Sequence, residues 1–164
     1  MLACALLLSA AASGAAPAVD APAAFARLKS LAGDWQGSAG EASMAGPMNV
    51  RYEVGAGGTI VKETLFHGTG HEMLNVYHLV GKDLVVTHYC TKGNQPQMTL
   101  REVRGDELVF DFTGGTNLDP AKDDHAHSAR IAIKGTDQVE EEWTFFAGGK
   151  SSGSARMLLS RRQP

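Results

Sequence analysis

The residues best suited to chemistry lie at the end of a β-branched run, in the segment Thr-His-Tyr-Cys-Thr-Lys-Gly-Asn-Gln-Pro at 87–96. If the run is a strand, His88 and Cys90 share one face and Tyr89 points to the other, because successive side chains alternate. An imidazole and a thiol on one face can supply two metal ligands, whereas structural zinc usually takes four. His88 could also activate Cys90 as a nucleophile, but the sequence names no orienting acid. We prefer the simpler interpretation of Cys90 as a small buried apolar residue.

A second histidine pair, His125 and His127, follows the acidic loop at 119–124. This pair would lie where a long loop enters a strand, and such loops commonly carry binding groups. Zinc or haem held by His88, Cys90, His125 or His127 is therefore an alternative hypothesis. Our primary prediction is that the protein holds no cofactor.

Catalytic signatures are weak throughout the chain. The serines, Asp124 and His125 can be combined on paper into a Ser-His-Asp set, but nothing in their spacing gives them the context of a hydrolase. Glycine motifs that cradle phosphate are also missing from the sequence. We therefore favour a binding protein and leave an enzyme as the open alternative.

The candidate residues are expected to lie on short strands separated by glycine. After a first helical stretch, the apolar period changes to two, and turn residues recur at about ten-residue intervals. The predicted strands lie around 35–37 and at 48–54, 59–66, 72–80, 83–90, 97–104, 107–113, 127–133, 139–146 and 154–161. Sequential strands joined by hairpin-sized loops predict an antiparallel meander.

We predict an all-β fold in which this meander closes into an antiparallel up-and-down barrel of about ten strands. A flat sheet would leave two exposed edges, and closure removes both of them. A barrel of this width can hold a small ligand as well as its own side chains. A sandwich of two open sheets is the structural alternative.

A short helix is predicted ahead of the barrel, over 21–33. Phe25, Leu28 and Leu31 recur about one helical turn apart and form an apolar stripe. Gly33 follows the stripe as a stop signal.

The first residues resemble a secretory signal peptide, which we place at 1–18, ahead of a single barrel domain at 19–164. Leu2 to Ala12 form an apolar run that is too short to span a bilayer, and small residues follow it. The run lacks a preceding Lys or Arg, so an Ala-rich tail is the competing interpretation. We predict export to the periplasm or the extracellular space.

The charge pattern gives no sign of a polyanionic partner. The formal net charge is −3, and basic and acidic residues are interspersed. We therefore predict neither nucleic-acid binding nor integral membrane association. The oligomeric state does not follow from the sequence.

The turn at Gly81-Lys82 sets the register of one hairpin. A two-residue loop pairs Val80 with Asp83 and puts His88 opposite Asn75. A three-residue loop would shift that register.

A second hairpin, between 127–133 and 139–146, contains an anomaly. Pairing Ile133 with Val139 makes an apolar face that also carries Glu141 and Trp143, and it places Arg130 on the other face. Either Glu141 hydrogen-bonds inside the cavity, or the register is off by one and Arg130 and Glu141 both line it.

Two patterns resemble known families. The stretch Phe25-Ala26-Arg27-Leu28 to Leu31-Ala32-Gly33-Asp34-Trp35-Gln36-Gly37 is similar to the start of calycin-type barrels, such as lipocalins and nitrobindins. The longer pattern HYC…GNQP, with FDF, TNL, HAHSARI and EEEWTF, resembles an uncharacterised family of exported bacterial proteins. The resemblance implies a barrel and no established activity.

From these observations we predict an exported barrel that binds a small, largely apolar molecule. A metal- or haem-binding barrel and a structural or interaction module without ligand are the alternatives. Aromatic residues with a few polar groups are the usual lining of such sites. The expected ligand-binding residues are Trp143, Glu141, Tyr77, His88, Phe110, Phe112, Asn94, Gln95 and Arg130, with Trp35, Phe66 and Phe145 as further aromatic lining.

Overall fold

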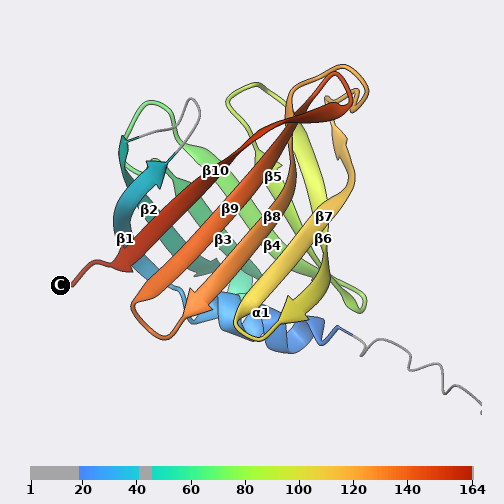
Figure 1. The fold of residues 1–164 in the computed structure, drawn as a ribbon. Coiled ribbons are helices and arrows are strands. Elements are labelled where there is room, and N and C mark those ends of the chain that lie inside the picture. The colour runs from blue at the N-terminus through green and yellow to red at the C-terminus, as the bar shows by residue number, and fades with distance from the viewer. Residues whose placement is uncertain (1–18, 41–45, 164) are drawn as a thin grey trace, which may run out of the picture.

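In the computed structural model, which describes residues 19–40 and 46–163, ten antiparallel strands close into a barrel (Figure 1). The strands are β1 (Gly33–Gly40), β2 (Gly46–Gly55), β3 (Ile60–Leu65), β4 (Met73–Val80), β5 (Asp83–Tyr89), β6 (Gln95–Arg104), β7 (Glu107–Thr116), β8 (His125–Lys134), β9 (Gln138–Ala147) and β10 (Lys150–Arg161). Each strand pairs with the next in sequence, and β10 pairs with β1. The predicted all-β up-and-down barrel is confirmed, and the open sandwich is excluded. The leader predicted at 1–18 lies outside the described residues.

Closure between β1 and β10 requires a glycine. Gly37 faces Leu159 across the pair, and a Cβ added at Gly37 would lie 1.9 Å from the carbonyl oxygen of Leu158. Any other residue would push the first and last strands apart. The glycine of the Trp-x-Gly motif therefore lets the barrel close.

Helix α1 (Ala21–Lys29) lies across one end of the barrel (Figure 1). Asp20 caps it by accepting a hydrogen bond from the Ala23 amide at 3.0 Å. Phe25 and Leu28 are buried against the barrel core. The helix is shorter than the predicted 21–33, because the chain turns after Lys29 to enter β1.

Arg161, at the end of β10, stabilises this closed end. Its guanidinium donates to the carbonyl oxygens of Ser30 at 3.0 Å and Ala32 at 2.8 Å. It also lies over the Trp35 ring, 4.4 Å from its centroid. A short 3-10 turn, η2 (Ala56–Gly58), joins β2 to β3.

Both predicted hairpin registers are confirmed. The partners are Val80 with Asp83, Asn75 with His88, Ile133 with Val139, and Arg130 with Glu142. His88 and Glu141 therefore both face the interior, and both are buried. In the described part of the chain, no helix combines the length and apolar character needed to cross a bilayer.

Candidate functional site

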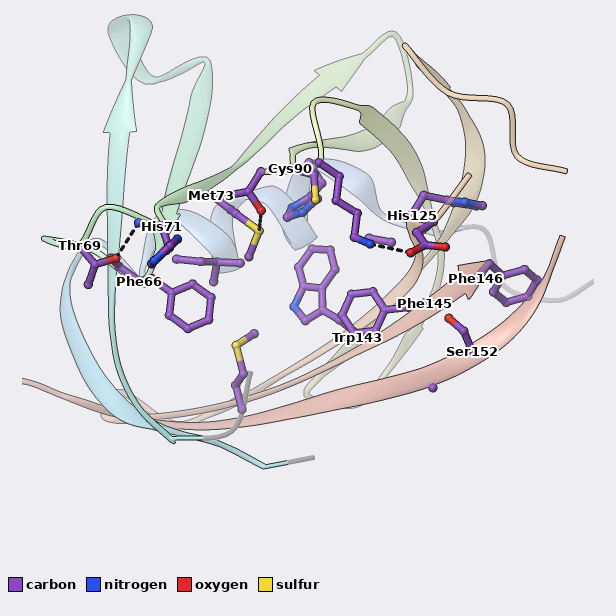
Figure 2. A pocket seen from close by; sticks show the side chains of 18 of the residues that line it. Phe66, Thr69, His71, Met73, Cys90, His125, Trp143, Phe145, Phe146 and Ser152 are labelled. Carbon is purple, nitrogen blue, oxygen red and sulfur yellow. Dashed lines mark hydrogen bonds and ion pairs between the residues drawn. The ribbon is translucent and has the colours of Figure 1, made fainter. Parts of the chain in front are cut away.

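A pocket of about 610 Å³ opens at the end of the barrel away from α1. This volume is typical of small-molecule sites. In Figure 2 the Trp143 indole reaches into the middle of the pocket, with Phe66 on one side and Phe145 on the other. The apolar lining consists of Leu65, Phe66, Met73, Ala126, Trp143, Phe145, Phe146 and Met157.

Most polar residues of the pocket come from the loops around its opening. Lys92 and Asp124 form an ion pair at 2.6 Å, and their side chains are 57% and 54% exposed, so both charges stay in contact with water. The other polar lining residues are Thr69, His71, His88, Cys90, Thr91, His125 and Ser152. Two of these residues are buried, His88 with 4% exposure and His125 with 2%.

Glu141 lies inside the barrel and is fully buried. Its carboxyl oxygens accept hydrogen bonds from the Tyr52 hydroxyl and, at 2.9 Å, from Trp143 Nε1. The first of the two alternatives for Glu141 is therefore the one observed. Glu141 does not itself line the pocket. The Trp143 indole, which lines the pocket and donates to Glu141, separates the carboxyl group from it.

A second buried carboxyl, Glu63 on β3, meets Glu141. Glu63 Oε2 accepts from Asn75 Nδ2 at 2.8 Å and from the Tyr77 hydroxyl at 2.7 Å. Burial, and secondly the charge of Glu141, raise the pKa of Glu63 well above its ordinary value. The raised pKa favours the protonated form of Glu63, whose Oε1 has no hydrogen-bond partner among the described residues.

This network fixes the protonation of His88. Asn75 uses its amide N–H on Glu63, so Asn75 Oδ1 can only accept, and it meets His88 Nδ1 at 2.7 Å. His88 Nδ1 must carry the hydrogen. Burial lowers the pKa of His88 to about 4, so the ring is neutral at about pH 7. Its Nε2 then carries a lone pair and makes no hydrogen bond among the described residues.

The second histidine pair lies near the rim. His125 Nε2 and His127 Nδ1 are 3.0 Å apart, and the His127 ring stacks on Phe146 with 3.6 Å between centroids. Burial, and secondly the neighbouring His125, lower the pKa of His127. His125 lines the pocket and His127 does not. Within the described ranges, no three His, Cys, Asp or Glu side chains form a group that could hold a metal ion.

The structure divides the predicted site residues into three groups. Those that line the pocket are Trp143, His88, Cys90, His125, Phe66 and Phe145. Those buried in the barrel without lining it are Glu141, Tyr77, Phe110 and Trp35. Those around the loops at the open end are Phe112, which stacks on His127, and Asn94 and Gln95, which hydrogen-bond to neighbouring loops.

Arg130 lies on the outer face of the barrel, and we no longer place it among the ligand-binding residues. Its guanidinium contacts Glu107 at 2.6 Å and Glu140 and Glu142 at 3.0 Å. The confirmed β8–β9 register is the reason, because it directs Arg130 and Glu142 together away from the interior.

The sequence did not indicate Glu63 or Tyr52 as site residues, and it gave Asn75 only as the cross-strand neighbour of His88. One signal was available: Glu63 alternates with the apolar residues Val61 and Leu65, which is the same anomaly that identified Glu141.

No protein-family model matches the chain, and no curated protein matches it either. The closed antiparallel barrel with one short helix is compatible with a calycin-like fold.

Proposed function

We propose that the protein binds a small, largely apolar molecule in the pocket at the open end of the barrel. One observation carries this proposal: the pocket of about 610 Å³ has an aromatic and aliphatic wall, and it is lined by His88, whose Nε2 makes no hydrogen bond among the described residues. A wall of this kind supplies binding free energy by burying apolar surface, and a lone polar group orients the ligand.

The residues that pack the closed end of the barrel differ from the residues that line the pocket. The closed end, with α1 and Arg161, packs the core, whereas the pocket is lined by residues of β2, β3, β4, β5, β8, β9 and β10 and the loops beside them. Loops on a rigid scaffold are the common position for binding residues. Side chains around the opening can therefore vary without loss of the barrel.

We propose that this binding takes place outside the cytoplasm. The support is the apolar run from Leu2 to Ala12 and the small residues after it. Mass analysis of the protein from its own host should show a chain that begins between about residues 15 and 21. An intact Met1 on protein from the cytosol would contradict export.

Haem or zinc binding is the second candidate, and His88 favours it specifically. An unprotonated imidazole nitrogen, with the other ring nitrogen held by Asn75, is the form that binds metals. Cys90 lines the same pocket and could add a thiolate. This candidate predicts a Soret band or stoichiometric zinc, lost in His88→Ala.

The test of the preferred function is a ligand panel on the full chain. Native mass spectrometry of protein from its own host would detect a retained ligand, and titration with fatty alcohols, fatty acids, retinoids and haem would be followed by Trp143 fluorescence. We expect at least one apolar ligand to bind with one-to-one stoichiometry. A panel without any binding would leave the structural or interaction module as the function.

A further inference from the structure

At the inner end of the pocket, the hydrogen-bonding role of His88 is fixed by its neighbours. His88 lines the pocket and is 4% exposed, and its Nδ1 is occupied by Asn75 at 2.7 Å. In the neutral ring one nitrogen donates and the other accepts. Because Nδ1 donates to Asn75, Nε2 can only accept.

Asn75, the hydrogen-bond partner of His88, prevents His88 from directing an N–H toward the pocket. If His88 moved its proton to Nε2, the bare Nδ1 would face Asn75 Oδ1, and two acceptors would meet. Asn75 cannot flip its amide in response, because its N–H donates to Glu63 at 2.8 Å. Tyr77 donates to the same Glu63 oxygen at 2.7 Å, so that oxygen stays an acceptor.

Electrostatics also disfavours an anionic ligand group at the inner end of the pocket. Two acidic side chains, Glu63 and Glu141, are buried inside the barrel, and Tyr52 and Trp143 already donate to Glu141. An anionic group at the inner end would face the His88 lone pair and these acidic groups. The cation that lines the pocket, Lys92, lies in the exposed loop after β5 and is paired with Asp124 at 2.6 Å.

We propose that the ligand carries an uncharged hydrogen-bond donor, in the simplest case a hydroxyl group, at its inner end, and that this group donates to His88 Nε2. This inference rests on the proposed function and goes beyond it, because it selects apolar alcohols over carboxylates and ethers of the same size. His88 is the specificity-determining residue, and Asn75 is a positioning residue that acts through it.

The binding test compares matched ligands on the full-length wild-type protein. The ligands are 1-decanol, its isomer 1-methoxynonane, which lacks the donor, and decanoate, which carries a negative charge. We expect 1-decanol to bind at least about tenfold more tightly than either, because an acceptor or an anion leaves His88 Nε2 unpaired. Equal or tighter binding of the ether or of decanoate overturns the inference and leaves the proposed function standing.

Failure of the proposed function gives a different result. If none of the three ligands binds, the pocket is not an apolar binding site, and the inference is overturned with it. The tautomer can be read without any ligand, from the nitrogen resonances of His88 by NMR. We expect a protonated Nδ1 and a bare Nε2, and a protonated Nε2 would overturn the inference by itself.

Variants assign the selectivity to His88. His88→Phe should bring the affinity for 1-decanol down to that for the ether, and Asn75→Leu should reduce the preference, because it frees both tautomers. His78→Phe makes the same chemical change at an outward-facing position of the neighbouring strand β4, opposite Val85, and it should keep the full preference. An undiminished preference in His88→Phe would contradict the assignment.

Discussion

Glu63 and Glu141 meet inside the barrel, and neither carboxyl group is exposed to solvent. Two ionised carboxylates in such contact would repel one another in a medium of low polarity. The raised pKa of Glu63, which favours its neutral form, and four donors, from Tyr52 and Trp143 to Glu141 and from Asn75 and Tyr77 to Glu63, resolve the conflict. The network ends at the pocket twice, on His88 and on Trp143.

The first prediction is an asymmetry between two conservative substitutions. Glu63→Gln replaces a carboxyl whose pKa is raised by a neutral group of the same shape and keeps an acceptor toward Asn75, so the free energy of unfolding should change by less than about 1 kcal/mol. Glu141→Gln places an amide N–H among groups that already donate, and it should cost about 2 kcal/mol. Urea denaturation of both variants checks this. A larger loss in Glu63→Gln would show that the proton is on Glu141.

The second prediction concerns the pH dependence of stability. His88 has a pKa of about 4 in the folded protein and about 6.5 when unfolded. As pH falls, the unfolded chain binds this proton first, so the stability that neutral His88 provides is complete above about pH 6.5 and is lost toward pH 4. The size of the effect is about 3 kcal/mol.

The measurement is the difference in free energy of unfolding between wild type and His88→Phe. This difference should fall by about 3 kcal/mol between about pH 7 and pH 4. The raised pKa of Glu63 acts in the opposite direction, but it is present in both proteins and cancels. A difference that stays constant with pH would mean that folded His88 titrates like an exposed histidine.

The third prediction is that Arg130 contributes to stability but not to ligand binding. Arg130→Met removes a guanidinium that contacts three carboxylates, one of them the nearly buried Glu140. The loss of stability should be about 1–2 kcal/mol, and it should shrink at high salt. The affinity for 1-decanol should stay at the wild-type value. Weaker ligand binding by a folded Arg130→Met protein would return Arg130 to the binding site.

The fourth prediction concerns Trp143, which is 2% exposed and donates to Glu141 at 2.9 Å. Trp143→Ala should lower the free energy of unfolding by about 3–5 kcal/mol, because it leaves a cavity and an unpaired carboxylate oxygen. Tyr89→Ala, at an aromatic ring that is 46% exposed, is the control and should cost less than about 0.5 kcal/mol. Similar losses in the two variants would show that Trp143 is not part of the core.

Local sequence patterns predict much of this fold. The Gly81-Lys82 turn specifies the β4–β5 register, and the alternation from Val139 to Trp143 specifies the inward face of β9. Closure also follows from local signals, since a meander of this length is best stabilised when its edges pair. These features depend on residues that are close together in the sequence.

The arrangement of the site could not be predicted in the same way. The contact of Glu63 with Glu141 joins β3 to β9 across the interior, so it depends on the diameter and stagger of the closed barrel. The same geometry decides that Trp143 and Phe145 line the pocket while Tyr77 and Phe110 fill the core. Alternation gives the face of each side chain, but its depth along the barrel follows only from the stagger of the strands.

The most direct test of the central claim is calorimetric titration of the full-length protein with 1-decanol, alongside a variant whose pocket is filled. Met73→Trp places an indole at a half-buried position of the pocket wall and should keep the barrel, as circular dichroism would show. We expect one binding site in the wild type and at least about tenfold weaker binding in Met73→Trp. The absence of binding to the wild type, or unchanged affinity in a folded Met73→Trp protein, would contradict this claim.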